Sequence, residues 1–194
     1  MKLLILGNSI THHSPAPEIG WTGDWGMAAT AREKDFVHQL AAMLEESGIT
    51  VELRERNVAD FERDPSLGLA SYFASELAFR PDVLVLRICE NTPEELLDDF
   101  AAAYGNLIRL FRRDPDCRVF AVGPFWPNDR AETLLCEAAA ETGAYWISLA
   151  PLHGEAWQAV GRFAHKGVAG HPSDRGMRAI AEAILEGFRD AGVL

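Results

Sequence analysis

Short apolar runs alternate with longer segments of helical period along the whole chain. Five runs rich in Leu, Val and Ile are short enough for strands and are bounded by turn residues; they cover residues 2–6, 50–54, 83–88, 118–122 and 145–149. Continuous apolar runs of this kind are typical of parallel strands that are buried on both faces of a sheet. The pattern therefore predicts an α/β chain built on one five-stranded sheet.

Between these runs, apolar residues recur every three or four positions, which predicts amphipathic helices. The expected helices run from Phe36 to a stop at Gly48, over 70–79, from an N-cap at Thr92 to Phe111, over 129–142, and around 177–188. Crossovers of this kind are right-handed and cover both faces of the sheet, so ligands bind at the carboxyl ends of the strands. Site residues are therefore expected directly after strands.

Length and composition favour one domain, residues 1–194, because a chain with 48% hydrophobic residues can bury a substantial core and no linker or repeat divides it. The three widely spaced cysteines (Cys89, Cys117 and Cys136) suit neither a disulfide framework nor a zinc cluster, which predicts a reduced, cytoplasmic protein. No apolar run approaches the roughly 20 residues of a membrane span, and residues 3–6 are too few for a signal peptide. Export and membrane insertion are not expected.

Charge narrows the possible partners. The formal net charge is −11 and the chain has only three lysines, so phosphate backbones and anionic membranes would be repelled. The turn at residues 7–12 lacks the glycine spacing of a dinucleotide-binding loop, and the adjacent His12 and His13 lack the spacing of metal ligands. We expect a small-molecule substrate, no nucleic-acid or membrane partner, no cofactor and no metal; the oligomeric state is not indicated.

Two polar residues follow predicted strands and should meet at the same edge of the sheet. Ser9 lies in the segment Gly7-Asn8-Ser9-Ile10-Thr11, where it is either a nucleophile on a glycine-assisted turn or simply a capping residue. Asn91 follows the third predicted strand and is either a site residue or an ordinary turn asparagine. Their shared position at the carboxyl edge favours the functional interpretation of both.

A histidine near the end of the chain should return to this edge. His171 precedes the final predicted helix, where Pro172 keeps it extended and Ser173 is the expected N-cap. A single loop histidine is more often an exposed surface residue than a base. Its convergence with Ser9 and Asn91 nevertheless predicts one site formed by all three.

These three segments together resemble the motif blocks of the SGNH (GDSL-like) hydrolase family. Gly7-Asn8-Ser9-Ile10-Thr11 resembles the first block, Asn91 the asparagine block and His171-Pro172 the histidine block, in the family's order and spacing. The resemblance covers essentially the whole chain and implies a three-layer α/β/α sandwich with a flavodoxin-like five-stranded parallel sheet. It also implies a serine esterase or acylhydrolase.

In the implied reaction, Ser9 attacks an ester carbonyl and His171 acts as general base, giving an acyl-enzyme that water then hydrolyses. The Ser9 N–H, the Asn91 side-chain amide and an N–H from residues 59–62 would form the oxyanion hole. A short acyl group is expected, such as acetyl on a carbohydrate or another small metabolite. The alternative is a binding protein that keeps the SGNH fold after its catalysis has been eroded.

Three departures from the family pattern bear on this reaction. Asn8 stands where the family usually has aspartate. The family's oxyanion glycine normally follows the second strand, but residues 57–62 contain no glycine. Val168 replaces the aspartate usually found three residues before the histidine. Either Asp174 or a backbone carbonyl within residues 167–170 could orient His171 instead. Asp174 also has a purely structural interpretation, as a carboxylate in the first turn of the last helix.

Aromatic residues supply candidate walls for a substrate pocket. The long segment after Ser9 carries Trp21 and Trp25, and long loops are often functional. Phe61, Phe125 and Trp126 also follow predicted strands. We expect these five side chains to border the pocket, although aromatic residues in loops can equally serve as hydrophobic anchors.

Overall fold

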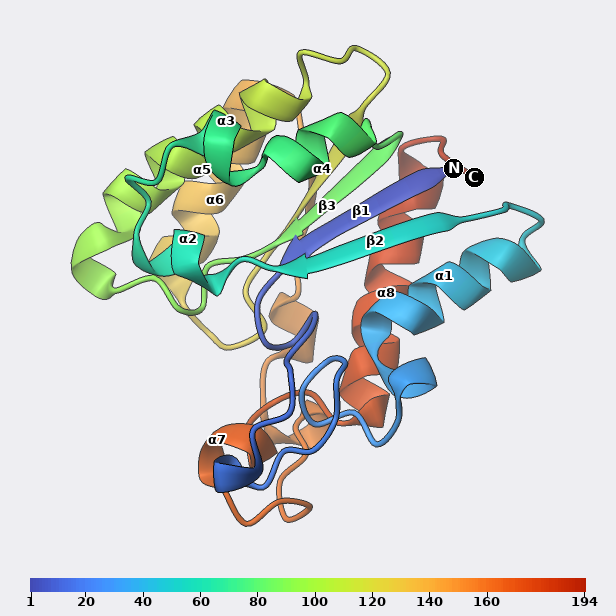
Figure 1. The fold of residues 1–194 in the computed structure, drawn as a ribbon, viewed down its shortest axis with the longest axis vertical. Coiled ribbons are helices and arrows are strands. Elements are labelled where there is room, and N and C mark those ends of the chain that lie inside the picture. The colour runs from blue at the N-terminus through green and yellow to red at the C-terminus, as the bar shows by residue number, and fades with distance from the viewer.

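The computed structural model describes all residues 1–194 and has a parallel five-stranded sheet with helices on both faces (Figure 1). The strands are β1 (Lys2–Gly7), β2 (Glu52–Asn57), β3 (Val83–Arg87), β4 (Arg118–Val122) and β5 (Tyr145–Ile147). Their order in the sheet is β2-β1-β3-β4-β5. The chain thus leaves β1 toward one edge and returns to its other side at β3, which places a crevice at the carboxyl ends of these strands. The predicted α/β/α sandwich is confirmed.

Two helices cover one face of the sheet and five cover the other (Figure 1). The first face carries α1 (Phe36–Glu46) and α8 (Asp174–Asp190); the second carries α2 (Ala59–Arg63), α3 (Leu69–Tyr72), α4 (Ala74–Phe79), α5 (Leu97–Phe111) and α6 (Asp129–Thr142). The short helix α7 (Lys166–Ala169) lies beyond the carboxyl ends of the strands, as do the loops at the bottom of Figure 1. Five single 3-10 turns complete the helical structure: 17–19, 32–34, 94–96, 150–152 and 155–157.

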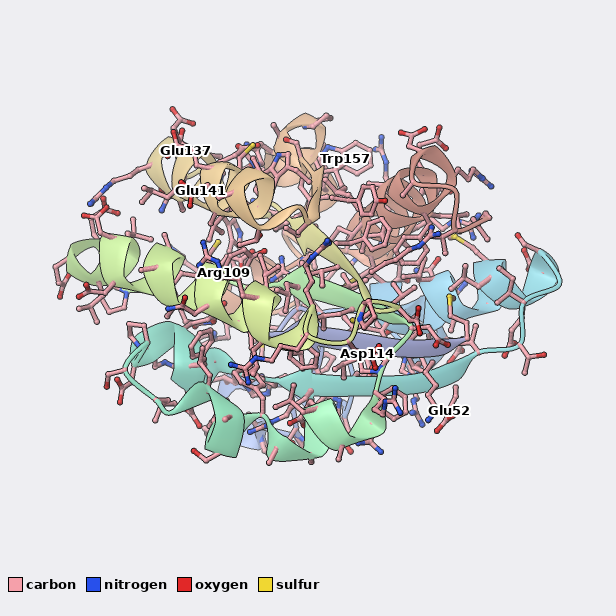
Figure 2. The ribbon with its side chains drawn as sticks, turned by 90° about the horizontal axis from the view of Figure 1, so that it is seen from above. Glu52, Arg109, Asp114, Glu137, Glu141 and Trp157 are labelled. Carbon is pink, nitrogen blue, oxygen red and sulfur yellow. The ribbon has the colours of Figure 1, made fainter.

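Each inner strand contributes side chains to two hydrophobic cores, because its side chains alternate between the faces of the sheet. Leu3 and Ile5 pack with α1 and α8 in a cluster of 23 buried residues, whereas Leu4 and Leu6 pack with α5 and α6 in a cluster of 22. The outer helix surfaces are charged: Figure 2 shows Glu137 and Glu141 of α6, and Arg109 of α5 lies 3.8 Å from Glu141. The apolar faces of the helices are therefore committed to the sheet.

A third, small cluster joins the loops beyond the carboxyl edge. Its six buried residues come from two distant segments and are Ala16, Trp21, Met27, Ala28, Ala159 and Val168. Backbone hydrogen bonds tie the second segment to the residues around His171, such as Ala159 N to His171 O at 2.9 Å. These loops form the walls around the end of β1.

Several predicted boundaries are wrong. β2 begins at Glu52 rather than residue 50 and extends to Asn57, because it is a charged edge strand with exposed residues that an apolar run does not describe. The predicted helix over 70–79 divides into α3 and α4, and Thr92 caps nothing, since a 3-10 turn precedes α5. No helix has both the length and the apolar character that crossing a bilayer requires.

Candidate active site

Ser9 lies on a tight turn immediately after β1. The turn is closed by hydrogen bonds from the N–H groups of Thr11 and His12 to the Asn8 carbonyl, at 2.9 and 3.0 Å. A Cβ on Gly7 would lie only 1.7 Å from the Thr11 hydroxyl oxygen, so the chain can fold back this sharply only with glycine there. The turn presents the Ser9 side chain at the carboxyl edge of the sheet.

The loop before α8 brings His171 to this serine. Ser9 Oγ lies 2.8 Å from His171 Nε2, and His171 Nδ1 lies 2.7 Å from the Gly167 carbonyl oxygen. Because a carbonyl only accepts, Nδ1 carries the proton and Nε2 is free to accept from the Ser9 hydroxyl. Trp126 packs edge-on against the imidazole, with ring centroids 5.2 Å apart, and donates to the Gly170 carbonyl. Ring orientation and tautomer are therefore both fixed.

Burial determines the protonation state of His171. Loss of solvent lowers its pKa from 6.5 to about 4, with a smaller contribution from the positive charge of Arg87, while the hydrogen bond to Gly167 acts in the opposite direction. The imidazole is accordingly neutral at neutral pH. A neutral ring with Nε2 facing a hydroxyl has the form that a general base needs.

Asp174 is not the group that orients His171. Its carboxylate accepts from the backbone N–H of Thr30 at 2.9 Å and from the Thr30 hydroxyl at 2.7 Å. As the first residue of α8 it follows the Ser173 N-cap, whose hydroxyl accepts from Gly176 N as predicted. The alternative that a carbonyl within 167–170 holds the imidazole agrees with the structure, whereas an Asp174 triad does not.

Asn91 reaches the same edge with its amide held at both ends. Its Nδ2 donates to Glu62 Oε2, and its Oδ1 accepts from Arg63 Nη2 at 3.4 Å. Glu62 and Arg63 are consecutive residues of α2, the short helix after β2. Glu62 was not predicted as a site residue, because an acidic residue in a short polar segment resembles a solvated surface position.

A buried charge network continues beneath Asn8. Asn8 Nδ2 donates to Glu62 and Glu90, at 2.9 and 2.6 Å, and Asn8 Oδ1 accepts from Arg87 at 2.6 Å. Arg87 is fully buried and donates to Glu90 Oε1 at 2.7 Å. At the position where the family usually has a charged aspartate, Asn8 therefore donates to two carboxylates and accepts from Arg87, and Glu62 and Glu90 supply the negative charge. Arg87 and Glu90 were also missed from sequence.

A cavity of about 490 Å³ opens onto these groups and is lined mainly by polar residues, including Ser9, Asn91, His171, Asn57, Asp60 and Arg63. The backbone N–H groups of Ser9 and Asp60, two of the residues that line it, have no partner in the chain. Within residues 59–62 the other N–H groups are used: Ala59 donates to the Asn57 side chain, and Phe61 and Glu62 donate to the Val58 carbonyl. The expected third donor is thereby narrowed to Asp60.

The five aromatic residues predicted to border the pocket do not line this cavity. Trp21, Phe61 and Phe125 are at most 3% exposed because they belong to the three hydrophobic clusters, and Trp25 packs edge-on against Trp21. Trp126 lies against His171 instead of facing the cavity. These residues anchor the loops, which is the alternative that the sequence left open.

Comparison with known proteins identifies the fold. No protein-family model and no curated protein matches the chain. Among solved structures it is similar to the psychrotrophic esterase EstA from Pseudoalteromonas sp. (10% identity, TM-score 0.68, covering 100% of this chain and 99% of EstA). It is also similar to LAE5, an α/β hydrolase enzyme from the metagenome of Lake Arreo (20%, 0.66, 96% and 94%). A third similar structure is Axe2, an acetylxylan esterase from Geobacillus stearothermophilus (18%, 0.61, 96% and 93%). The fold is that of the SGNH hydrolases, as the resemblance implied.

Proposed function

We propose that the chain is a carboxylic ester hydrolase of the SGNH type, with Ser9 as nucleophile and His171 as general base. The observation that carries this proposal is the 2.8 Å contact between Ser9 Oγ and a neutral, carbonyl-held imidazole at the mouth of a polar cavity. The esterases among the structures of similar fold support it. Ser9 also lies at the carboxyl end of β1, which is where ligands bind in sheets of this topology.

In the first step, His171 Nε2 takes the Ser9 proton while Oγ forms a bond to the ester carbonyl carbon, giving a tetrahedral oxyanion. The alkoxide then leaves with the proton held on Nε2, and an acyl-Ser9 ester remains. Water activated by the same nitrogen attacks this ester, releasing the acid and restoring Ser9. The Ser9 N–H, the Asp60 N–H and Asn91 Nδ2 are positioned to receive the oxyanion.

The substrate is proposed to be a small, polar ester with a short acyl group. A cavity of about 490 Å³ with predominantly polar lining provides no apolar channel for a long chain. Acetyl on a carbohydrate or another small metabolite fits this description, and an acetylxylan esterase is among the proteins of similar fold. The proposal is tested by comparing p-nitrophenyl esters from acetyl to palmitoyl, together with acetylated sugars.

A covalent probe tests the nucleophile directly. EstA was solved inhibited by monoethylphosphonate, so a fluorophosphonate is a suitable reagent. We expect one adduct by intact mass, mapped to Ser9, and loss of both labelling and p-nitrophenyl acetate hydrolysis in Ser9→Ala. Ser14→Ala is the matched control, because Ser14 is exposed nearby and should leave both unchanged. Ligand binding without hydrolysis or labelling would favour the eroded binding protein instead.

A further inference from the structure

Resting on the proposed function, we propose that Glu62 is a positioning residue that keeps the Asn91 amide turned with Nδ2 toward the oxyanion, and that it does so only as a carboxylate. Glu62 touches no reacting atom in the proposed mechanism. Its effect on the reaction passes through Asn91, which lines the cavity with Ser9 and His171. The proposal adds a proton-dependent step to a site whose base is already neutral.

The contacts of Glu62 fit an ionised carboxylate. The side chain is fully buried and accepts three N–H groups: Oε1 accepts from Asn8 Nδ2 at 2.9 Å and from Cys89 N at 2.5 Å, and Oε2 accepts from Asn91 Nδ2. None of these three groups can accept a hydrogen bond. A proton on either oxygen would therefore face a donor, which a buried site tolerates poorly.

The same contacts determine which way the Asn91 amide points. Glu62 attracts its NH₂ group, and Arg63 donates to its oxygen from the other side. A protonated Glu62 instead favours an amide turned by 180°, so that Oδ1 accepts from the new O–H. That rotation replaces a donor by an acceptor at the oxyanion position, where developing negative charge would be repelled.

The charges around Glu62 place its titration in an accessible range. The charged and titratable groups around Glu62 are Arg87 of β3 and Cys89 and Glu90 after β3, with Asp60 and Arg63 in its own helix; Asn8 donates to it from the β1 turn without carrying a charge. Burial and the negative charge of Glu90 raise the pKa of Glu62 to about 7, with Asn91, Asn8 and Arg87 acting in the opposite direction. The pKa of His171 is far lower, at about 4, so the two ionisations separate.

The first test compares the pH dependence of kcat in the parent protein and in Asn91→Ala, using p-nitrophenyl acetate. Because the raised pKa means that Glu62 gains a proton as pH falls through about 7, we expect the parent kcat to decline through that range. Asn91→Ala has no amide to misplace, so its lower kcat should stay level until the His171 range near pH 4. A decline near pH 7 that persists in Asn91→Ala would overturn the proposal.

A double-mutant cycle tests the same coupling. Glu62→Gln keeps the shape of the side chain but offers an amide that can turn Asn91, so kcat should fall roughly 10²–10³-fold, as when an oxyanion donor is lost, with KM within about threefold. The double variant with Asn91→Ala should lie within about threefold of Asn91→Ala alone; multiplying effects would refute the coupling. Glu76→Gln is the control, because Glu76 is another buried glutamate, which lies in α4, pairs with Arg56 and should leave kcat unchanged when replaced.

A spectroscopic measurement separates this proposal from the proposed function. The Asn91 side-chain amide signals should shift with a midpoint near pH 7 in the parent and in Ser9→Ala, which does not turn over substrate. They should not shift in Glu62→Gln; if that variant does not fold, the Ser9→Ala titration and the kcat comparison still decide. If the Asn91 amide signals do not change between pH 5 and 9, the positioning role of Glu62 is overturned even in an active esterase. If the amide titrates but the protein is inactive, only the proposed hydrolase function is refuted.

Discussion

Asp174→Asn separates the carbonyl-held pair from a triad. In serine proteases, the corresponding change in an orienting aspartate lowers kcat by about 10⁴, or roughly 5.5 kcal/mol of barrier. Here the carboxylate contacts Thr30, and His171 Nδ1 is occupied by the Gly167 carbonyl 2.7 Å away. We therefore expect kcat within tenfold of the parent, which is under about 1.4 kcal/mol.

The change should instead lower stability by a modest amount that the contacts define. An asparagine oxygen can still accept from the Thr30 N–H, but the charge-assisted hydrogen bond that the Thr30 hydroxyl donates to the carboxylate is replaced by a neutral one, at about 0.5–1.5 kcal/mol. Loss of the negative charge in the first turn of α8 adds about 0.3–1 kcal/mol. The exposed pair with Arg162, at 3.9 Å, adds little. The sum of about 0.8–2.5 kcal/mol corresponds to roughly 2–10 °C in Tm.

Two assays on the same preparation check this expectation. Hydrolysis of p-nitrophenyl acetate gives kcat, and urea unfolding gives the free energy of unfolding. Thr30→Ala is the matched control, since it removes the hydroxyl partner and should lower stability without lowering kcat. A loss of kcat beyond 100-fold in Asp174→Asn, with the fold intact, would refute the reasoning and restore an Asp174 triad.

Three further outcomes follow from the site. Asn91→Ala should lower kcat by about 10²–10³ with little change in KM, because an oxyanion donor acts in the transition state; steady-state kinetics decide, and a change confined to KM would make Asn91 a turn residue. Gly7→Ala should lower the free energy of unfolding by at least 1–3 kcal/mol, about the cost of overpacking, because its Cβ meets Thr11 at 1.7 Å; an unchanged urea midpoint would contradict this. The pKa of His171 in the folded state lies below its unfolded value of 6.5. The free energy of unfolding should therefore be highest above pH 6.5 and should fall by up to about 3 kcal/mol as pH falls to about 4. His171→Gln should remove this pH dependence relative to the parent.

The parts of the fold that the sequence predicted well are those in which burial dominates. β1, β3 and β4 are covered on both faces, so their apolar runs locate them to within a residue. β2 is an edge strand with the sequence ELRERN, and because of its exposed charges the same criterion placed it over residues 50–54 instead of Glu52–Asn57. Edge position is a property of the assembled sheet, which a local pattern does not contain.

The site shows the same division. Ser9, Asn91 and His171 could be predicted to lie together because each follows a strand or precedes a helix at one edge of the sheet. Glu62 and its charged partners were missed because ionisable residues read as solvated until the surrounding segments bury them. The prediction that five aromatic side chains border the pocket was wrong, because a loop sequence does not specify whether a large ring faces the substrate or the interior.

The six-residue hydrophobic cluster that holds the loops beyond the carboxyl edge affects the order in which the site and the sheet unfold. His171 belongs to a segment anchored through Val168 in a cluster of only six buried residues, whereas Ser9 is attached to a strand between clusters of 23 and 22. Regions with few buried apolar contacts open at lower free energy than the core. Mild denaturant should therefore detach the base from the nucleophile while the sheet remains folded. In such a protein, inactivation would precede unfolding, and amide hydrogens of residues 153–172 would exchange faster than those of β1 and β3.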